Sequence, residues 1–174
     1  LSLYVDGARL AYALACPEND VRLPDLAKLC DAFYIGGTKC GALFGEAVVI
    51  PEKRNFPFFP TTIKQHGALL AKGKALGVQF DALFTDDLYL QIGKHAIELA
   101  DKIRSALQKK GIPLAVSSPT NQIFILLKKE EAERIGKAVE LTHWDDPDDE
   151  HSILRICTSW STEEEDVEKL LAIL

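Results

Sequence analysis

The stretch Leu1-Ser-Leu-Tyr-Val-Asp-Gly-Ala-Arg9 decides the fold class expected for this chain of 174 residues. Its first five residues are apolar and β-prone, which predicts a buried strand over 1–5. A charged turn follows, and the alanine-rich segment 10–15 then predicts a helix. A strand that ends in a charged loop and opens a helix is typical of a parallel α/β sheet, in which ligands bind at the carboxyl ends of the strands.

The pattern continues in the same way along the first half of the chain. Pro24 lies near the first turn of a short predicted helix. The glycine-rich segment 36–45 separates two further predicted strands. Gly77 is expected to end a longer helix. The ranges are helices over 23–30 and 63–76, strands over 31–35 and 47–50, and a loop over 51–60.

The second half predicts a smaller α+β unit. Apolar residues spaced for one helix face predict a long amphipathic helix over 87–110 that ends at Gly111. Strands are expected over 122–127 and 152–158, with a helix over 130–139 between them. Ser161 and Glu164 have capping-box spacing and predict the start of a last helix. We therefore expect a large-domain segment over 1–86 and a small C-terminal domain over 87–174.

Composition narrows the possible partners and compartment. Hydrophobic residues make up 47% and charged residues 26%, as in an ordinary soluble protein, and the net charge is −6. A negative balance argues against nucleic acid or an anionic membrane as a partner, because both attract basic surfaces. The acidic run over 145–150 predicts a solvated loop rather than a metal site. The four cysteines lack metal-ligand or CxxC spacing, so a reducing compartment, the cytoplasm, is expected.

Two charged positions carry the candidate chemistry. Lys39 lies among glycines after a predicted strand, and the spacing of a phosphate-binding P-loop is absent around it. Asp6 and Arg9 lie at the end of the first strand. Taken singly, Lys39 is consistent with a surface turn and the Asp6–Arg9 pair with a local ion pair. Taken together, an acid and a lysine at neighbouring strand ends fit pyridoxal phosphate (PLP), which needs a lysine for a Schiff base and an acid beside its pyridine nitrogen.

Five stretches in order along the chain resemble the PLP-dependent threonine aldolases and related β-eliminating lyases of fold type I. The segment Leu3–Leu10 resembles their cofactor-binding segment, and 31–43 resembles their lysine loop. The interval of ~30 residues between the two is long enough for a helical crossover between parallel strands. The other three matching stretches are 63–72, 118–122 and 154–160.

This resemblance implies roles for individual residues. Lys39 would carry the cofactor, and Asp6 would pair with the pyridine nitrogen. Arg9 would lie against the cofactor near its 3′-oxygen, and Thr38 would contact the phosphate. Arg155 would bind the substrate carboxylate, for which a planar guanidinium is suited, although an ion pair at a strand edge is the alternative for this residue.

Four further residues in the matching stretches receive weaker expectations. Asn121 and Gln122 are expected to be structural or near the substrate. His66 is expected in helix packing or a subunit contact rather than as a catalytic base, and Cys40 is expected to be a bystander. The family's phosphate loop and ring-stacking histidine have no counterpart here, and the chain opens on a strand without methionine, so we expect a fragment of a longer protein.

The activity implied is cleavage of β-hydroxy amino acids, L-threonine or L-allo-threonine, to glycine and acetaldehyde. β-Elimination from another amino acid is the first alternative, because the same residues serve it, with Lys39 taking the α-proton. A non-catalytic chain is the second alternative. The resemblance also implies a homodimer or homotetramer.

Overall fold

The structure is a computed structural model that describes residues 1–52 and 57–174. The chain forms two compact units. Unit 1 comprises Leu1–Leu14 and Asn19–Ile92, and unit 2 comprises Ala15–Glu18 and Gly93–Leu174. The expected boundary between two domains at residue 86 stays a prediction. Of the expected loop over 51–60, residues 53–56 lie outside the described part.

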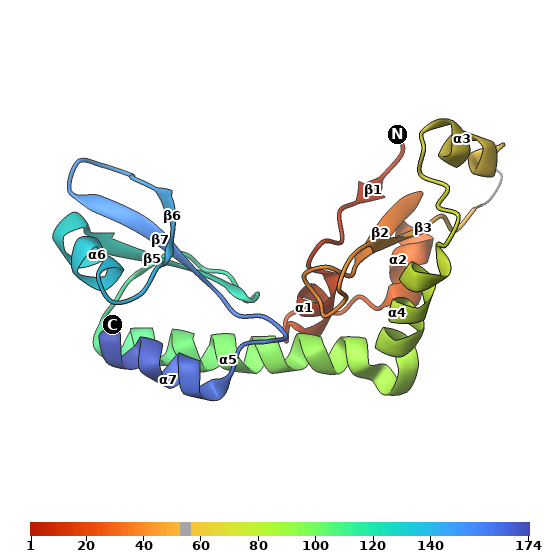
Figure 1. Ribbon diagram of the computed structural model, residues 1–174. Coiled ribbons are helices and arrows are strands. Elements are labelled where there is room, and N and C mark those ends of the chain that lie inside the picture. The colour runs from red at the N-terminus through yellow and green to blue at the C-terminus, as the bar shows by residue number, and fades with distance from the viewer. Residues whose placement is uncertain (53–56) are drawn as a thin grey trace. The chain divides into compact units, whose positions relative to one another are not determined.

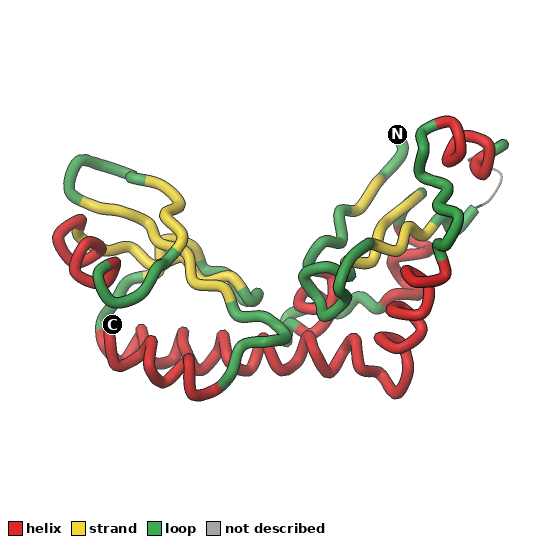
Figure 2. Tube along the Cα trace, viewed as in Figure 1, coloured by secondary structure: helices red, strands yellow, loops and turns green. Residues whose placement is uncertain are grey.

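Unit 1 contains a three-stranded mixed sheet in the order β1-β2-β3 (Figures 1 and 2). Strand β1 (Tyr4–Val5) is parallel to β2 (Ala32–Gly36), as the strand-helix pattern predicts. Strand β3 (Glu46–Val49) is antiparallel to β2, so the expectation of a mostly parallel sheet is wrong for these strands. The reason is the short connection over 37–45, because a return to parallel pairing needs a crossover of about a dozen residues or more.

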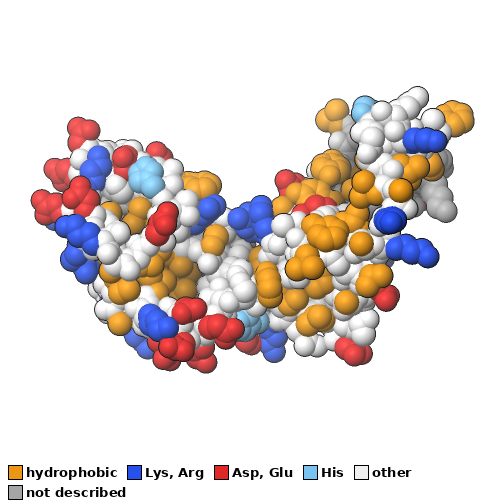
Figure 3. Space-filling view, viewed as in Figure 1, with side chains coloured by type: hydrophobic (Ala, Val, Ile, Leu, Met, Phe, Trp, Pro, Cys, Tyr) orange, Lys and Arg blue, Asp and Glu red, His pale blue; other side chains and the backbone are white. Residues whose placement is uncertain are grey.

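The first strand is shorter and more exposed than expected. Only Tyr4 and Val5 pair with β2, and the expected buried strand over 1–5 is wrong in burial, because Leu1 and Leu3 are exposed. β1 lies at the edge of the described sheet, so one of its sides has no strand beside it among the described residues. Unit 1 also exposes many other large apolar side chains (Figure 3).

The helices of unit 1 are α1 (Leu10–Ala15, which reaches into unit 2 by one residue), α2 (Leu23–Leu29), α3 (Phe59–Gln65) and α4 (Lys74–Phe84), followed by the 3-10 turn η2 (Thr85–Asp87). The single helix expected over 63–76 is wrong. Gly67 has a φ of 69° and ends α3, and α4 begins after Gly73. Gly77 lies inside α4 instead of ending a helix, since a glycine there costs only about 1 kcal/mol.

Unit 2 contains an antiparallel sheet in the order β4-β5-β7-β6. Its strands are β4 (Leu114–Val116), β5 (Gln122–Lys128), β6 (Thr142–Asp145) and β7 (His151–Cys157). Its helices are most of α5 (Leu88–Lys110), with α6 (Lys129–Gly136) and α7 (Glu164–Ile173). These helices lie against one side of the sheet, whose other side is free of helices in this unit (Figure 1).

Alternation along the two central strands builds the core of unit 2. Every second residue of β5 and of β7 is buried, and the residues between them are partly exposed. The buried side packs against apolar residues of the three helices, as period-2 patterning predicts. The cluster contains Leu99, Ala100, Ile103, Leu107, Ile123, Ile125, Leu127, Ile135, Leu154, Ile156 and Val167.

Three expectations for unit 2 need correction. Strands β4 and β6 were not predicted, because β4 is short and β6 is exposed along its whole length and reads as part of an acidic loop. Helix α6 ends at Gly136, three residues early. Helix α7 is capped at Glu163 without a side-chain hydrogen bond, so the predicted Ser161 capping box does not form. No helix in the described ranges has the length and apolar character needed to span a bilayer.

Candidate active site

Parallel pairing brings the Asp6 segment and the Lys39 loop together in unit 1. Val5 lies opposite Phe33, so the residues that follow the two strands are neighbours. The Gly36 amide donates a hydrogen bond of 2.9 Å to the Gly7 carbonyl oxygen, which also accepts one of 3.0 Å from the Leu10 amide at the start of α1. A single carbonyl therefore fixes the first helix and the lysine loop to the same point.

The glycines at this junction are required by backbone packing. A Cβ at Gly7 would lie 1.8 Å from the Tyr34 carbonyl oxygen, and one at Gly36 would lie 2.5 Å from the carbonyl oxygens of Gly7 and Ala8. Both distances are far inside van der Waals contact, and a backbone atom cannot move aside as a side-chain tip can. The glycines beside Asp6 and ahead of Lys39 are therefore needed where the two backbone segments cross, apart from any role of Asp6 and Lys39 in catalysis.

Asp6 is held as an anion at the end of β1. Its Oδ1 accepts a hydrogen bond of 3.0 Å from the Ala8 amide and a second from the Tyr34 hydroxyl. The Tyr34 hydrogen bond, the Ala8 hydrogen bond and the charges of Lys39 and Arg9 hold the pKa of Asp6 below its usual value of 3.8. The same contact with Asp6 raises the pKa of Tyr34 to about 12.

Lys39 lies exposed in a tight turn after β2. The Cys40 and Ala42 amides both donate to the Gly37 carbonyl oxygen, at 2.8 and 3.0 Å. The Gly37 amide donates to Glu46 Oε2 at 2.6 Å. The lysine side chain is thus presented by a turn whose backbone is fixed at its base.

Two buried tyrosines hold the same turn from beneath. The Tyr12 hydroxyl donates to the Lys39 carbonyl oxygen, and the Tyr89 hydroxyl donates to the Gly36 carbonyl oxygen at 2.9 Å. Burial, with Cys40 beside it, raises the pKa of the Tyr89 phenol, so this hydroxyl stays a donor.

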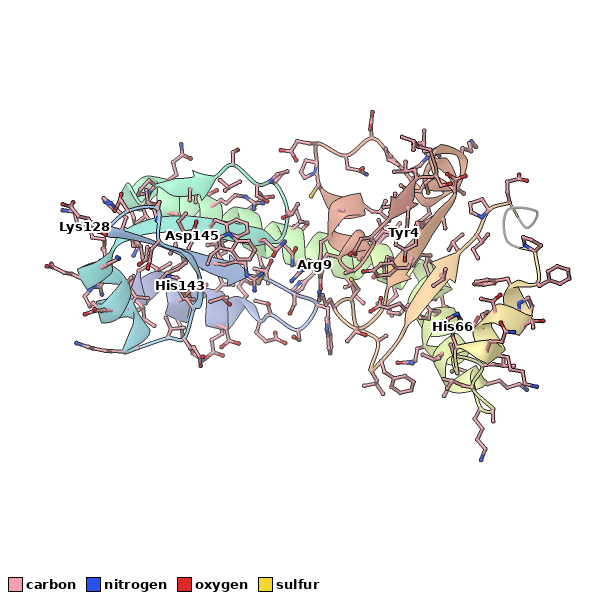
Figure 4. The ribbon with its side chains drawn as sticks, turned by 90° about the horizontal axis from the view of Figure 1, so that it is seen from above. Tyr4, Arg9, His66, Lys128, His143 and Asp145 are labelled. Carbon is pink, nitrogen blue, oxygen red and sulfur yellow. The ribbon has the colours of Figure 1, made fainter. Side chains whose placement is uncertain are left out.

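The remaining expected residues of unit 1 lie at different distances from this turn. Thr38 is exposed, and its hydroxyl donates to the Gly45 carbonyl oxygen at 3.4 Å. Arg9 immediately precedes α1, and His66, at the end of α3, lies well apart from it and is exposed (Figure 4). Cys40 is buried beneath the turn, 3.9 Å from the Ala8 carbonyl oxygen, so it is a packing residue there.

Arg155 lies in unit 2, on β7, and is half-buried. Its Nη1 donates to Gln122 Oε1 at 3.2 Å, and its guanidinium carbon lies 5.1 Å from the centre of the Trp144 ring. Its Nε is buried without a hydrogen-bond partner among the described residues. Figure 4 labels His143 and Asp145, which flank Trp144 in β6.

The segment that leads into β5 is fixed by Arg104. This side chain donates to three successive carbonyl oxygens, those of Ser118, Pro119 and Thr120, at 3.1, 3.2 and 2.7 Å. Its other contact is an ion pair of 2.7 Å with Asp101. The next residue, Asn121, is 3% exposed and donates to the Thr158 carbonyl oxygen at 2.6 Å, and its Oδ1 is buried without a hydrogen-bond partner among the described residues.

The sequence named several of the charged residues of this candidate site but not the residues that hold them in place. The structure brings Asp6, Lys39, Arg9 and Thr38 into one unit, and Arg155 belongs to the other. Four partners were missed. Alternation in β2 could have pointed to Tyr34, because Phe33 and Ile35 are buried around it. The sequence carries no comparable signal for Tyr12, Tyr89 and Glu46, whose contacts depend on the fold.

Comparisons with known proteins find relatives in sequence and in structure. The low specificity L-threonine aldolase of a Pseudomonas species is 28% identical over 133 residues, which cover 74% of this chain. The corresponding Pseudomonas aeruginosa protein is 27% identical over the same length. The structure of Leishmania major threonine aldolase matches with a TM-score of 0.95 and 40% identity over 99% of this chain. No family model matches the chain.

More distant structures share the fold alone. Sphingomonas wittichii serine palmitoyltransferase matches with a TM-score of 0.67 at 14% identity. The chain spans 38% of the length of each Pseudomonas protein and 51% of the Leishmania chain, about half or less of the relatives it matches. In sequence and in structure, the chain is similar to part of the threonine aldolases, and its fold is shared with serine palmitoyltransferase.

Proposed function

We propose that this chain is part of a PLP-dependent lyase that cleaves L-threonine or L-allo-threonine to glycine and acetaldehyde. The observation that carries the proposal is the junction of Asp6 and the Lys39 turn. An anionic carboxylate and an exposed lysine lie on segments joined through Gly7 and Gly36. The similarity to proteins named threonine aldolases supports the choice of reaction.

The residues present fit the cofactor. Both hydrogen bonds to Asp6 end on Oδ1, and among the described residues no donor reaches Oδ2. A carboxylate with a lowered pKa and a free oxygen can accept the N–H of a pyridinium ring and keep that nitrogen protonated. When bound, PLP supplies an electron sink that stabilises the carbanion left by cleavage of the Cα–Cβ bond.

Each of the other residues then has a distinct task. The Lys39 amine would hold the cofactor covalently through a Schiff base. Arg9 would hold the cofactor near its 3′-oxygen, and the Thr38 hydroxyl would hold its phosphate. Arg155 binds the substrate carboxylate through its planar fork of donors. The base that takes the β-hydroxyl proton is not among these residues.

The cofactor assignment is tested by chemical trapping. The full-length protein is incubated with PLP, reduced with borohydride and mapped by mass spectrometry, and a pyridoxyl group is expected on Lys39. Lys39→Ala is expected to lose the label and the yellow absorbance, whereas Lys28→Ala, an exposed lysine of α2, keeps both. A label on another lysine, or yellow colour retained by Lys39→Ala, contradicts the assignment.

The reaction is tested by products. L-Threonine and L-allo-threonine are expected to give glycine and acetaldehyde. Products of β-elimination, a 2-oxo acid and ammonia, would favour the alternative in which Lys39 removes the α-proton. Absence of turnover in a protein that carries labelled Lys39 would favour a non-catalytic chain.

We also propose a homodimer or homotetramer that works in the cytoplasm and takes amino-acid substrates. Light scattering of the purified full-length protein gives its mass in solution. A monomer that is fully active would contradict the oligomer.

A further inference from the structure

The helix-free side of the unit 2 sheet carries a small aromatic and cationic cluster around Arg155. The buried residues of β5 and β7 face the helices, so the residues between them, Phe124 and Arg155 among them, face the other way. Phe124 and Arg155 are directly paired across the two strands. Trp144, at an irregularity in β6, packs edge-on against Phe124 with 5.0 Å between ring centres.

The Arg155 side chain is constrained on two sides. The Arg155 guanidinium carbon lies over the Trp144 ring, 5.1 Å from its centre, and Gln122 accepts one of the guanidinium hydrogen bonds. A guanidinium over an indole is held by the attraction between its charge and the face of the ring. The hydrogen bond to Gln122 uses one of five N–H donors, so the fork retains donors for a planar anion.

We propose that Trp144 and Gln122 are positioning residues for the substrate carboxylate. They act through Arg155, whose guanidinium plane and direction they fix before the substrate arrives. The aromatic face of Trp144 sets the tilt of the plane, and Phe124 keeps Trp144 in place by its edge-on contact. The inference rests on the proposed function of Arg155 as the carboxylate-binding residue.

The physical advantage is that little side-chain freedom is lost on binding. A free arginine has many rotamers, and ordering them opposes the formation of two parallel hydrogen bonds. An arginine that already contacts an aromatic ring and makes a hydrogen bond loses less, so its affinity for a carboxylate is greater at the same charge. Loss of Trp144 should therefore weaken carboxylate binding while the charge of Arg155 remains.

The first experiment measures the constraint itself, without catalysis. The full-length protein and its Trp144→Ala and Gln122→Ala variants are labelled with phenylglyoxal, and modification of each arginine is followed by mass spectrometry. Arg155 is expected to react several-fold faster in both variants, and addition of glycine to slow this reaction. Arg22, exposed on unit 1, serves as the internal reference. An unchanged rate at Arg155 in Trp144→Ala would overturn the proposal.

The second experiment separates a carboxylate effect from general damage. Binding of glycine and of methylamine, which lacks the carboxylate, is followed through the absorbance of the PLP-loaded protein. Trp144→Ala is expected to raise the Kd for glycine roughly threefold, the scale of a cation–π contact at an exposed site, and to leave methylamine binding unchanged. With threonine, KM should rise more than kcat falls. Trp144→Phe, which keeps an aromatic face, should restore most of the affinity.

The matched control lies next to Trp144 in the same strand. His143→Ala removes an exposed side chain that pairs with Asp146, and no hydrogen bond or ring contact among the described residues joins it to Arg155. It should leave glycine binding unchanged. Equal weakening by His143→Ala, or equal loss of glycine and methylamine in Trp144→Ala, would show that β6 merely supports the fold. Failure of the proposed function appears differently, as wild-type protein in which glycine neither binds nor protects Arg155.

Discussion

The two units reach stability by different means. Unit 2 has a continuous apolar cluster in which β5 and β7 alternate over three helices. Unit 1 has strands of five residues or fewer, and most of the large apolar side chains that the described residues expose belong to it. Its candidate site is held by close backbone crossings at Gly7 and Gly36 and by tyrosine hydroxyls. The candidate cofactor residues thus lie where the geometry depends on backbone contacts rather than on a large core.

This difference implies that the two units should lose stability through different kinds of substitution. A cavity should damage unit 2 most, because its stability comes from side-chain packing. An added methyl group should damage unit 1 most, because its backbone segments are already in contact.

The largest effect is expected from Ile125→Ala in β5. Ile125 is fully buried in the unit 2 cluster, so the cavity should lower the free energy of unfolding by about 4 kcal/mol. Hydrogen exchange followed by mass spectrometry should show faster exchange in β5 and β7 and unchanged exchange in β2. Val116→Ala, at an exposed site on β4, is the control. Equal loss of protection in β2 would break the distinction between the units.

A somewhat smaller effect is expected from Gly7→Ala in unit 1. The new Cβ would overlap the Tyr34 carbonyl oxygen, and the strain should cost about 3 kcal/mol. Faster exchange in β2 and weaker retention of PLP should accompany it. Gly136→Ala places the same methyl group in open space at the end of α6, where it should be neutral or stabilising by up to ~1 kcal/mol. A stable Gly7→Ala protein that retains PLP normally would contradict the tight crossing.

The smallest effect is expected from Tyr34→Phe. The Tyr34 hydroxyl is the largest cause of the lowered pKa of Asp6, so its removal should move that pKa up toward 3.8. Because the folded-state pKa is depressed, the stabilisation from Asp6 is present above 3.8 and lost as pH falls through the folded pKa. In Tyr34→Phe the stabilisation from Asp6 should be smaller, and its loss should be complete at a higher pH.

Carboxyl carbon NMR measures this titration residue by residue. Asp25, whose pKa is lowered chiefly by Arg22, should titrate identically in both proteins. A pKa of Asp6 that stays in place or falls would refute the role of the Tyr34 hydroxyl.

The sequence predicted the fold best where burial is one-sided. The strands expected over 122–127 and 152–158 are β5 and β7, apolar spacing located α5, and Gly111, with a φ of 73°, follows α5 as expected. It failed where local patterns compete with tertiary packing. Helix α4 runs through Gly77, and β6 forms from exposed polar residues because β7 offers it an edge.

The candidate site likewise contains residues that the sequence could predict and residues that it could not. Asp6 and Lys39 were predicted from their place after strands and from a resemblance, and their assigned roles stay predictions. Their supports were not predictable, because Tyr12, Tyr89 and Glu46 reach the lysine turn from separate elements. Trp144 was missed because its strand was missed.

Arg104 has a consequence for insertions and deletions in this chain. Arg104 donates to three successive carbonyl oxygens just ahead of β5. These hydrogen bonds fix the position of the segment, and therefore the number of residues that fits before β5 begins. A slip of one residue would turn Ile123 and Ile125 toward solvent and place Gln122 and Phe124 in the core. Arg155 would then face a different neighbour across the strands. Lengthening this loop by one residue should therefore be tolerated far less well than lengthening the acidic turn between β6 and β7.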